Sequence, residues 1–327
     1  MFITSVSRLK RLQKIVFNNP KFVLWVEEYL FYPRTFVQKA LAYALLPFSF
    51  IYCFIVLLKR IRNKRRCKSY GIPIVSIGNL TVGGNGKTPF GIALAKNYSN
   101  VAIVLRGYGR KSHGLLVVSN QGQTMCDALA SGDEAMLYAK SLPDSTVIVS
   151  EDRVEAIRLA KKMGAKIIFM DDGFSKRYIE KIDILIRPNP EPEKWFCLPS
   201  GPYREPRFLY EKADLVIEEN RDFFREVSVV SPTEKMLLVT AISKPQRLDP
   251  YLPENVIDKV YYPDHYIFSE LELQTLLENS GATSILTTQK DAVKMATFEL
   301  PISLLKLDVT IDPDILEKIN TLLAAKR

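Results

Sequence analysis

The sequence has few histidines and no closely spaced cysteines. Its four cysteines, Cys53, Cys67, Cys126 and Cys197, lie far apart and form no CxxC pair. This spacing gives no sign of a disulfide framework, so a reducing compartment such as the cytosol is the simpler interpretation. The sequence also lacks internal repeats and low-complexity tracts. A chain of 327 residues is long enough for two modest domains, each with its own core.

Acidic residues are scarce at the N-terminal end. Residues 1–70 contain 14 lysines and arginines but only Glu27 and Glu28 as acids, whereas the rest of the chain contains 31 basic and 34 acidic side chains. The net charge of +9 therefore belongs to the N-terminal segment. Because a nucleic-acid-binding protein needs a basic face on its folded body, we expect no nucleic-acid partner. No obligate protein partner is evident either.

Charge is entirely missing from residues 40–58, ALAYALLPFSFIYCFIVLL. As a helix this run would be about 28 Å long, close to the bilayer core, although Pro47 would kink it, so a re-entrant or interfacial helix is an alternative to a span. A basic cluster follows, and such clusters stay on the cytoplasmic side. It consists of Lys59, Arg60, Arg62, Lys64, Arg65, Arg66 and Lys68. We expect residues 1–70 to attach to a membrane; a buried core helix is the alternative.

Short apolar runs alternate with helical patterns from residue 72 onward. Buried parallel strands are expected at 72–77, 100–105, 146–150, 166–170 and 182–186, with helices at 86–99, 132–142 and 151–164. This alternation predicts an α/β fold with a doubly wound, mostly parallel sheet (α/β/α). A proline-rich passage at 187–206 marks a junction, after which a second series of strands predicts a smaller α/β domain. The expected domains are therefore 71–188 and 189–327.

The stretch GNLTVGGNGKTPF at residues 78–90 follows the first predicted strand and leads into a helix. It ends like a phosphate-binding P-loop, although Thr81 stands where the strict pattern has glycine. The glycines allow backbone N–H groups to approach an anion, Lys87 would neutralise β/γ-phosphate oxygens and the Thr88 hydroxyl would bind Mg²⁺. The predicted nucleotide-binding residues are Thr81, Val82, Gly83, Gly84, Asn85, Gly86, Lys87 and Thr88. A glycine-rich turn with an accidental lysine is the alternative.

Candidate acids and bases lie at strand ends and in loops. Asp171 and Asp172 follow the strand at 166–170, where a P-loop enzyme needs an acid for its metal. The alternative is that Asp-Asp-Gly only forms a turn after the strand. Asp133 opens a helix as either an N-cap or a catalytic carboxylate. Of the two histidines, His113 lies in a polar loop, whereas His265 lies among aromatic residues and is a candidate general base or an ordinary surface histidine.

These motifs together resemble the tetraacyldisaccharide 4′-kinases of lipid A biosynthesis. The matching segments, in the family's order, are GNLTVGGNGKTP (78–89), RGYGR (106–110), GDEA (132–135), EDR (151–153), DDGF (171–174), LPSGPYREP (198–206), AISKPQRL (241–248), YPDHYIF (262–268) and TTQKDAVK (287–294). The irregular Thr81 is part of the resemblance, as is the N-terminal hydrophobic helix. Ser175–Arg177 and Gln289 depart from the family pattern.

The resemblance implies transfer of the γ-phosphate of ATP, with Mg²⁺, to the 4′-hydroxyl of an acylated glucosamine disaccharide 1-phosphate. It implies that Lys87 serves the nucleotide and that Asp133 with His265 activates the sugar hydroxyl. It also implies acidic positions near the metal at Glu134, Asp171 and Asp172. Candidates for binding the substrate are Arg106, Tyr108, Arg110, Arg153 and Arg204. The protein would then sit at the bacterial inner membrane, with its catalytic domains on the cytoplasmic face.

Other P-loop functions fit the sequence less well. A membrane-bound ATPase switch of the partitioning or targeting type is the main alternative, but such proteins carry a signature lysine where this chain has Val82. A GTPase would need an N-K-x-D motif, which is missing downstream. A degenerate scaffold is disfavoured by the intact Gly86-Lys87-Thr88. A kinase of a soluble sugar would not explain the apolar run and its basic cluster.

Overall fold

The structure is a computed structural model, and it describes residues 20–242, 245–264 and 266–326. These residues form two compact units. Unit 1 contains residues 20–62, 80–83 and 188–212, and unit 2 contains residues 63–79, 84–187 and the described residues from 213 onward. The predicted domain junction near residue 188 coincides with the start of a unit 1 segment. The predicted domain assignment itself stays an interpretation.

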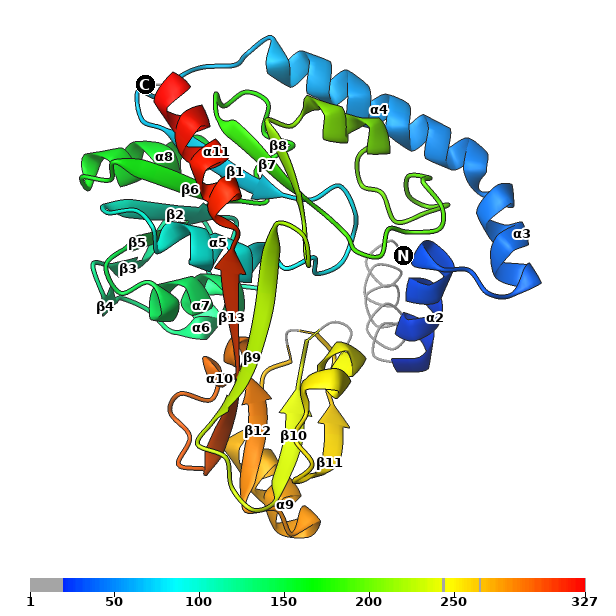
Figure 1. The fold of residues 1–327 in the computed structure, drawn as a ribbon, viewed down its shortest axis with the longest axis vertical. Helices are drawn as coiled ribbons and strands as arrows, with labels where there is room; N and C mark the ends of the chain where they lie inside the picture. The colour runs from blue at the N-terminus through cyan, green and yellow to red at the C-terminus, as the bar shows by residue number, and fades with distance from the viewer. Residues whose placement is uncertain (1–19, 243–244, 265, 327) are drawn as a thin grey trace, which may run out of the picture. The chain divides into compact units, whose positions relative to one another are not determined.

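The larger sheet of unit 2 has the strand order β4-β3-β5-β2-β6-β1-β7-β8 (Figure 1). Its strands are β1 (Ile74–Gly78), β2 (Val101–Leu105), β3 (Leu116–Asn120), β4 (Gln123–Thr124), β5 (Thr146–Val149), β6 (Ile167–Asp171), β7 (Ile182–Arg187) and β8 (Leu215–Glu218). The six strands from β5 to β8 in this order are parallel, whereas β3 and β4 are antiparallel additions at one edge. The carboxyl ends of β1 and β6 are therefore neighbours.

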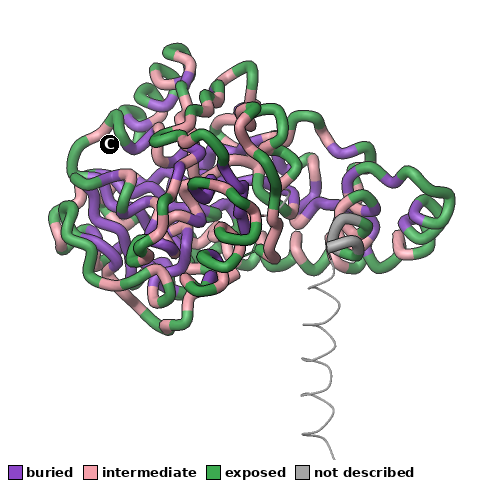
Figure 2. The backbone as a smooth tube through the Cα atoms, turned by 90° about the horizontal axis from the view of Figure 1, so that it is seen from below, coloured by how far each residue is buried: buried purple, intermediate pink, exposed green. Residues whose placement is uncertain are grey.

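The central strands are buried along their whole length, which explains their nearly continuous Val/Ile-rich sequences. Every residue of β1, β2, β5 and β6 is buried, and the buried stretches are purple in Figure 2. Helices follow these strands along the chain: α5 (Lys87–Ala95), α6 (Ala128–Ser131), α7 (Asp133–Ser141) and α8 (Arg153–Lys162). The core contains apolar side chains of α5 and α7 against the sheet.

The second sheet of unit 2 has the order β11-β10-β12-β13-β9. Its elements are β9 (Phe223–Val230), β10 (Met236–Thr240), η2 (Pro245–Tyr251), β11 (Val256–Tyr261), α9 (Glu270–Ser280), β12 (Ser284–Thr288), α10 (Gln289–Ala292) and β13 (Ile302–Ile311). The two long strands β9 and β13 pair antiparallel and continue to the core of the larger sheet, where Phe223 packs on Phe90 with ring centroids 5.3 Å apart. The C-terminal helix α11 (Pro313–Ala325) also packs on that core.

The described residues of unit 1 form three α-helices, one 3₁₀ helix and an irregular segment. Its elements are α2 (Pro20–Phe31), α3 (Phe36–Ala44), α4 (Leu46–Lys64) and η1 (Arg207–Lys212), with the C-terminal end of α4 in unit 2. The predicted break near Pro47 is present, because α3 ends at Ala44 and α4 continues at an angle of 50°. Within the described part of the chain, no single helix qualifies as a membrane span, and only this bent pair has the length and composition for one.

The fold class predicted from the sequence is confirmed, and three strands were missed. The strands β3, β4 and β9 are antiparallel, and β9 alternates between partly buried and exposed residues, so it lacks the continuous apolar run that marks the parallel strands. The run at 213–218, expected in the second domain, forms β8 at the edge of the larger sheet. The larger sheet therefore extends past the predicted junction.

Candidate active site

The phosphate loop leaves β1 and returns as the first turn of α5. In unit 2, the Nζ atom of Lys87 donates to Oδ1 of Asn79 at 3.0 Å, which tethers the lysine to the end of the strand. Gly86, immediately before the helix, has a φ of +79°, a left-handed conformation that favours glycine. The N-terminus of α5 thus presents free N–H groups beside a lysine, which is an arrangement that binds phosphate.

Two arginines from the second sheet region lie against this loop. The Nη1 atom of Arg247 donates to the carbonyl oxygen of Gly84 at 2.8 Å. A Cβ atom on Gly86 would lie 2.3 Å from Nη2 of Arg225, so a larger residue at this position would displace that guanidinium. Burial lowers the pKa of Arg225, against the opposing effect of its ion pair with Glu219 at 2.9 Å. These positive groups were not found from the sequence, because they are distant along the chain.

Asp171, at the end of β6, faces the loop. Its Oδ2 atom accepts a long hydrogen bond of 3.5 Å from the Thr88 hydroxyl and one of 3.3 Å from the Tyr138 hydroxyl. Tyr138 reaches this point because Gly91 has no side chain: a Cβ there would lie 2.3 Å from the tyrosine oxygen. Thr88 and Asp171, both predicted to serve the metal, are therefore neighbours in unit 2, and their role as ligands stays a prediction.

The electrostatics of Asp171 suit a cation. Burial raises its pKa to about 7, and the neighbouring charge of Glu134 adds to the effect, partly offset by Lys87. Its buried Oδ1 atom has no hydrogen-bond partner among the residues that the structure describes. Mg²⁺ commonly takes one or two carboxylates, a hydroxyl, water and substrate phosphates rather than an all-protein cage. In keeping with this, no group of three or more His, Cys, Asp or Glu side chains among the described residues forms a metal cage by itself. The residues therefore fit a nucleotide-bound Mg²⁺.

Asp133 begins α7 and is joined by an ion pair to the TTQKDAVK motif. Its Oδ2 atom lies 3.5 Å from Nζ of Lys294, and both side chains are largely buried. Lys294 in turn contacts Oδ1 of the fully buried Asp291 at 2.7 Å. The other oxygen of Asp291 accepts from the hydroxyls of Thr240 and Thr288 at 2.7 and 3.0 Å. Lys294 is thus fixed in place and stabilises a charged Asp133, a role that the sequence alone did not reveal.

A second lysine of the same motif carries acidic neighbours. Lys290 pairs with Asp264 at 3.0 Å. Burial acts to lower the pKa of Lys290, but Asp264, Glu134 and Asp133 outweigh it, so the pKa is raised. The predicted base His265 lies outside the described residues. Its role with Asp133 stays a prediction.

The predicted substrate-binding residues of unit 2 differ in their surroundings. The Arg110 side chain is almost fully buried and donates to Glu151 and the Gly114 carbonyl at 2.6 Å each, so it organises its own loop. Arg153 is also buried, and burial lowers its pKa against the opposing charges of Asp171 and Asp172. Tyr108 is exposed, as is Arg106 in the same loop. All four stay predictions.

Three of the predicted residues, Thr81, Val82 and Arg204, belong to unit 1. Thr81 is fully buried and forms an isolated antiparallel β-bridge with Tyr203. The Val82 N–H donates to the Pro202 carbonyl at 2.8 Å. The backbone N–H of Arg204 donates to the Leu80 carbonyl at 2.7 Å. The LPSGPYREP motif therefore brackets the first residues of the phosphate loop. This contact joins two motifs that are about 120 residues apart in the sequence.

The chain matches the family model described as tetraacyldisaccharide-1-P 4′-kinase over residues 41–232 and 224–324. It is 48% identical over 302 residues to the tetraacyldisaccharide 4′-kinase of Aliarcobacter butzleri, covering 90% of this chain and 95% of that protein. It is 47% identical over 296 residues to the protein of the same name from Helicobacter pylori, covering 90% and 94%.

The structure is also similar to a crystal structure of LpxK from Aquifex aeolicus in complex with ATP. The TM-score is 0.72 and the sequence identity is 27%, with 86% of this chain and 99% of that chain covered. The similarity therefore extends over most of this chain and nearly the whole length of the ATP-binding relative.

Proposed function

Because the chain belongs to the tetraacyldisaccharide-1-P 4′-kinase family, we propose that it transfers the γ-phosphate of ATP to the 4′-hydroxyl of a tetraacylated disaccharide 1-phosphate. The product is the bis-phosphorylated precursor of lipid A. Family membership favours this kinase activity over the ATPase switch considered from the sequence. The acceptor and the position of transfer follow from the names of the relatives. The roles that we propose for individual side chains are argued from the geometry of unit 2 and from the family resemblance.

The contact between Thr88 and Asp171 carries the proposal. It brings a hydroxyl of the phosphate loop to a buried carboxylate at the end of a neighbouring parallel strand, 3.5 Å away. This is the arrangement by which P-loop enzymes hold a magnesium ion against the β- and γ-phosphates. When bound there, Mg²⁺ supplies charge neutralisation and holds the phosphate oxygens in place for in-line transfer.

The chain's own groups bind and orient the nucleotide. Lys87, tethered to Asn79, is placed to neutralise charge on the β/γ-phosphate oxygens. The guanidinium groups of Arg225 and Arg247, which lie at Gly86 and Gly84, add positive charge. Phosphoryl transfer needs little covalent chemistry from the protein, so positioning and electrostatic stabilisation supply most of the catalysis.

Asp133 is the group that we assign to the acceptor hydroxyl. A general base must be ionised and held within reach of the proton that it accepts. The ammonium of Lys294, 3.5 Å away, stabilises the carboxylate form, and the buried Asp291 keeps that ammonium in place. We assign the proton from the 4′-hydroxyl to Asp133 acting together with His265, as the family resemblance implies.

The same proposal places the protein at the bacterial inner membrane, with unit 2 on the cytoplasmic face. Its support comes from α4, whose outward residues are large and apolar: Phe48, Phe50, Ile51, Phe54, Ile55, Leu58 and Ile61 are all at least half exposed. The basic cluster begins at the C-terminal end of this helix and suits anionic headgroups. An acylated acceptor resides in the same membrane, which explains why a kinase carries such a surface.

The decisive experiment uses purified full-length protein, Mg·ATP and the tetraacylated disaccharide 1-phosphate dispersed in detergent. Mass spectrometry with fragmentation locates any added phosphate on the sugar. We expect a single phosphate at the 4′ position and none with Lys87→Ala. Phosphate elsewhere, or ATP hydrolysis without a phosphorylated lipid, would refute the proposal. Equal activity of Lys87→Ala would show that the phosphate loop is misassigned.

A further inference from the structure

Lys290 is a cation of unit 2 to which the proposed reaction assigns no role so far. It lies on α10, which packs on α7, the helix that begins with Asp133 and Glu134. Its Nζ atom pairs with Oδ1 of Asp264 at 3.0 Å. Burial acts to lower the pKa of Lys290, but the charges of Asp264, Glu134 and Asp133 together raise it. The ammonium of Lys290 therefore lies among three carboxylates.

The two carboxylates on α7 are assigned to opposite ends of the transfer step. Asp133 is assigned to the acceptor hydroxyl, and Glu134 is predicted near the metal that holds the β- and γ-phosphates. The two residues are consecutive in the first turn of the helix. The phosphoryl group must pass from the phosphate loop to the acceptor, and so between the groups that serve these two ends. A cation close to both carboxylates lies beside that path.

Lys294, four residues further along the chain, differs from Lys290 in its partner. It pairs with Asp291, and the two side chains are 5% and 0% exposed, so leaving this pair would strand a buried charge. The partner of Lys290, Asp264, is 38% exposed. An exposed pair of this kind is weak and easily exchanged. Lys294 is therefore fixed, whereas Lys290 can exchange its carboxylate for a phosphate group, which carries more negative charge.

The backbone that carries Lys290 is held in place. The Thr288 hydroxyl caps α10 by accepting from the Asp291 N–H at 3.2 Å, and the Gln289 side chain accepts from the Leu307 N–H at 2.9 Å. These bonds tie the turn to β12 and β13. Because a lysine has a flexible four-carbon stem, its ammonium can be redirected toward a bound phosphate while the turn stays where it is.

Phosphoryl transfer needs positive charge on the group that moves. In the transition state, charge is spread over the three equatorial oxygens of the γ-phosphoryl group. Lys87, Arg225 and Arg247 lie at the phosphate loop, which is the nucleotide's end of the step. Lys290 lies at the acceptor's end, beside Asp133. It is therefore suited to neutralise the charge that the metal and the loop do not reach.

From these observations we propose that Lys290 is a catalytic residue, whose ammonium leaves Asp264 and donates hydrogen bonds to the non-bridging oxygens of the γ-phosphoryl group. This inference rests on the proposed function and adds a residue to it. In the step itself, the bond from the γ-phosphorus to the β-phosphate oxygen breaks, and a bond to the 4′-oxygen forms. The hydroxyl proton passes to Asp133 acting with His265, ADP leaves, and Lys290 keeps its own protons throughout.

Replacing the lysine tests its effect on the rate. Lys290→Met should lower kcat by about 10²–10³-fold, as does the loss of one donor to a developing charge, and leave the KM for ATP little changed. Lys290→Arg keeps the positive charge and should recover part of the loss. Full kcat of Lys290→Met would overturn the inference.

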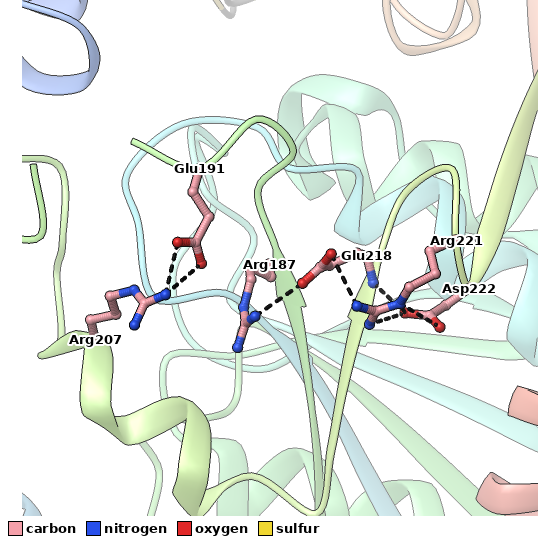
Figure 3. A network of polar contacts seen from close by, with 6 residues as sticks. All are labelled: Arg187, Glu191, Arg207, Glu218, Arg221 and Asp222. Carbon is pink, nitrogen blue, oxygen red and sulfur yellow. Dashed lines mark hydrogen bonds and ion pairs between the residues drawn. The ribbon is translucent and has the colours of Figure 1, made fainter. Parts of the chain in front are cut away.

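The matched control is Arg221→Met. It breaks an ion pair of similar length, 3.1 Å to Glu218, in the network at the ends of β7 and β8 (Figure 3). Arg187 and Asp222 belong to the same network, at 3.1 Å from Glu218 and 2.6 Å from Arg221. Arg221→Met should have the kcat of the wild type. An equal loss of kcat in the two variants would show that breaking an ion pair anywhere in unit 2 is enough, and would overturn the role of Lys290.

A transition-state analogue separates the phosphoryl group from the rest of the nucleotide. The probe is ADP with Mg²⁺ and aluminium fluoride, which takes the place of the transferred group, in the presence of the disaccharide 1-phosphate. In calorimetry, Lys290→Met should bind this probe about 10²–10³-fold more weakly than the wild type, and bind ADP with Mg²⁺ equally well. Equal weakening for ADP and for the probe would show that Lys290 serves the nucleotide or the fold instead.

A double variant separates Lys290 from Asp264. If the lysine only held Asp264 in place, Asp264→Asn would already remove that contribution, and adding Lys290→Met would cost nothing more. If the lysine acts on the phosphoryl group, Lys290→Met lowers kcat by a similar factor in the Asp264→Asn background and in the wild type. Absence of a further loss in the double variant would overturn the inference.

The outcomes also separate the residue from the activity. If the wild type makes the 4′-phosphorylated product and Lys290→Met keeps full kcat, the role of Lys290 is wrong and the kinase proposal stands. If the wild type makes no such product, both are wrong. Circular dichroism shows whether Lys290→Met folds. If it does not, Lys290→Gln, which keeps a polar side chain, replaces it in the three measurements.

Discussion

The Nζ atom of Lys294 lies 2.7 Å from Oδ1 of Asp291, with side-chain exposures of 5% and 0%. A buried ion pair at this distance fixes the lysine, whose charge also faces Asp133. Replacing one partner leaves the other charge without compensation in a low-dielectric environment. The ion pair therefore contributes to the stability of the second sheet and also holds the charge that keeps the proposed catalytic carboxylate of Asp133 ionised.

Lys294→Met should lower the free energy of unfolding by about 3–5 kcal/mol, because Asp291 stays buried without its counter-charge. Urea unfolding followed by circular dichroism measures this. The control is Lys306→Met, which breaks an exposed pair with Asp308 at 42% exposure on both sides. It should cost less than about 1 kcal/mol. Equal losses in the two variants would mean that Asp291 does not depend on Lys294.

Asp133→Asn should lower kcat by about 10²–10⁴-fold, since an amide cannot accept the proton of the acceptor hydroxyl. Affinity for Mg·ATP, measured by isothermal titration calorimetry, should change little, because Asp133 is assigned to the acceptor. Asp127→Asn is the matched control: Asp127 caps α6, and asparagine caps as well as aspartate. Full activity of Asp133→Asn would remove Asp133 from the role of base. His265→Ala should reduce kcat in the same range.

Asp171 should make nucleotide binding depend on pH. Burial raises the pKa of Asp171 to about 7 in the folded protein without nucleotide. In the unfolded chain the same carboxyl has its ordinary, lower pKa and releases its proton at lower pH. The contribution of Asp171 to stability is therefore largest below about pH 4 and falls as the pH rises to about 7. Mg²⁺ needs the ionised form, so affinity for Mg·ATP should rise with pH up to about 7.

Calorimetry in buffers of different ionisation enthalpy tests this behaviour. Binding of Mg·ATP below about pH 7 should release a proton from Asp171 in the wild type. After correction for titration of the nucleotide itself, Asp171→Asn should release none and bind Mg·ATP weakly at every pH. The exposed Asp127→Asn should behave like the wild type. Identical proton release by Asp171→Asn and the wild type would show that another group titrates.

The phosphate loop could be predicted from the sequence because its chemistry is local. Gly86, Lys87 and Thr88 are consecutive residues between a strand and a helix, and Asp171 ends an unmistakably buried strand. The topology of a parallel sheet then brings the carboxyl ends of neighbouring strands to one edge. Sequence periodicity is enough for such a site, since each part follows directly from its own element.

The contacts from the second sheet could not be predicted in this way. Lys294 meets Asp133, and Arg225 meets Gly86, only because the long pair β9–β13 returns the chain to the larger sheet. No local pattern encodes a pairing across more than 100 residues. Predicted site residues also differ in what they do: Arg110, expected to bind substrate, holds Glu151 and its own loop. A family motif identifies such residues without revealing their partners.

Gly91→Ala should destabilise the protein through Tyr138. The new Cβ would lie 2.3 Å from the tyrosine oxygen and 3.3 Å from Cδ1 of Ile77, so the ring must move and Asp171 loses one of its two donors. We expect a loss of about 1–3 kcal/mol from this overpacking, measured by thermal unfolding. Tyr138→Phe removes the clashing oxygen, so the double variant should recover part of that loss. Additive losses in the double variant would show that the two sites are independent.

The outward face of α4 should hold the protein on lipid. Phe54→Asp with Leu58→Asp exchanges two large side chains, 63% and 50% exposed, for charges that anionic lipid repels. Burial of each of these side chains in lipid is worth about 1.5–3 kcal/mol, so binding to vesicles with anionic phospholipid should fall by more than tenfold in sedimentation assays.

The matched control, Ile257→Asp with Leu271→Asp, makes the same kind of change on unit 2 and should sediment like the wild type. High salt should weaken binding of the wild type as well, because the cluster from Lys59 onward adds a screened attraction. Full sedimentation of the α4 variant at low salt would show that another surface attaches the protein.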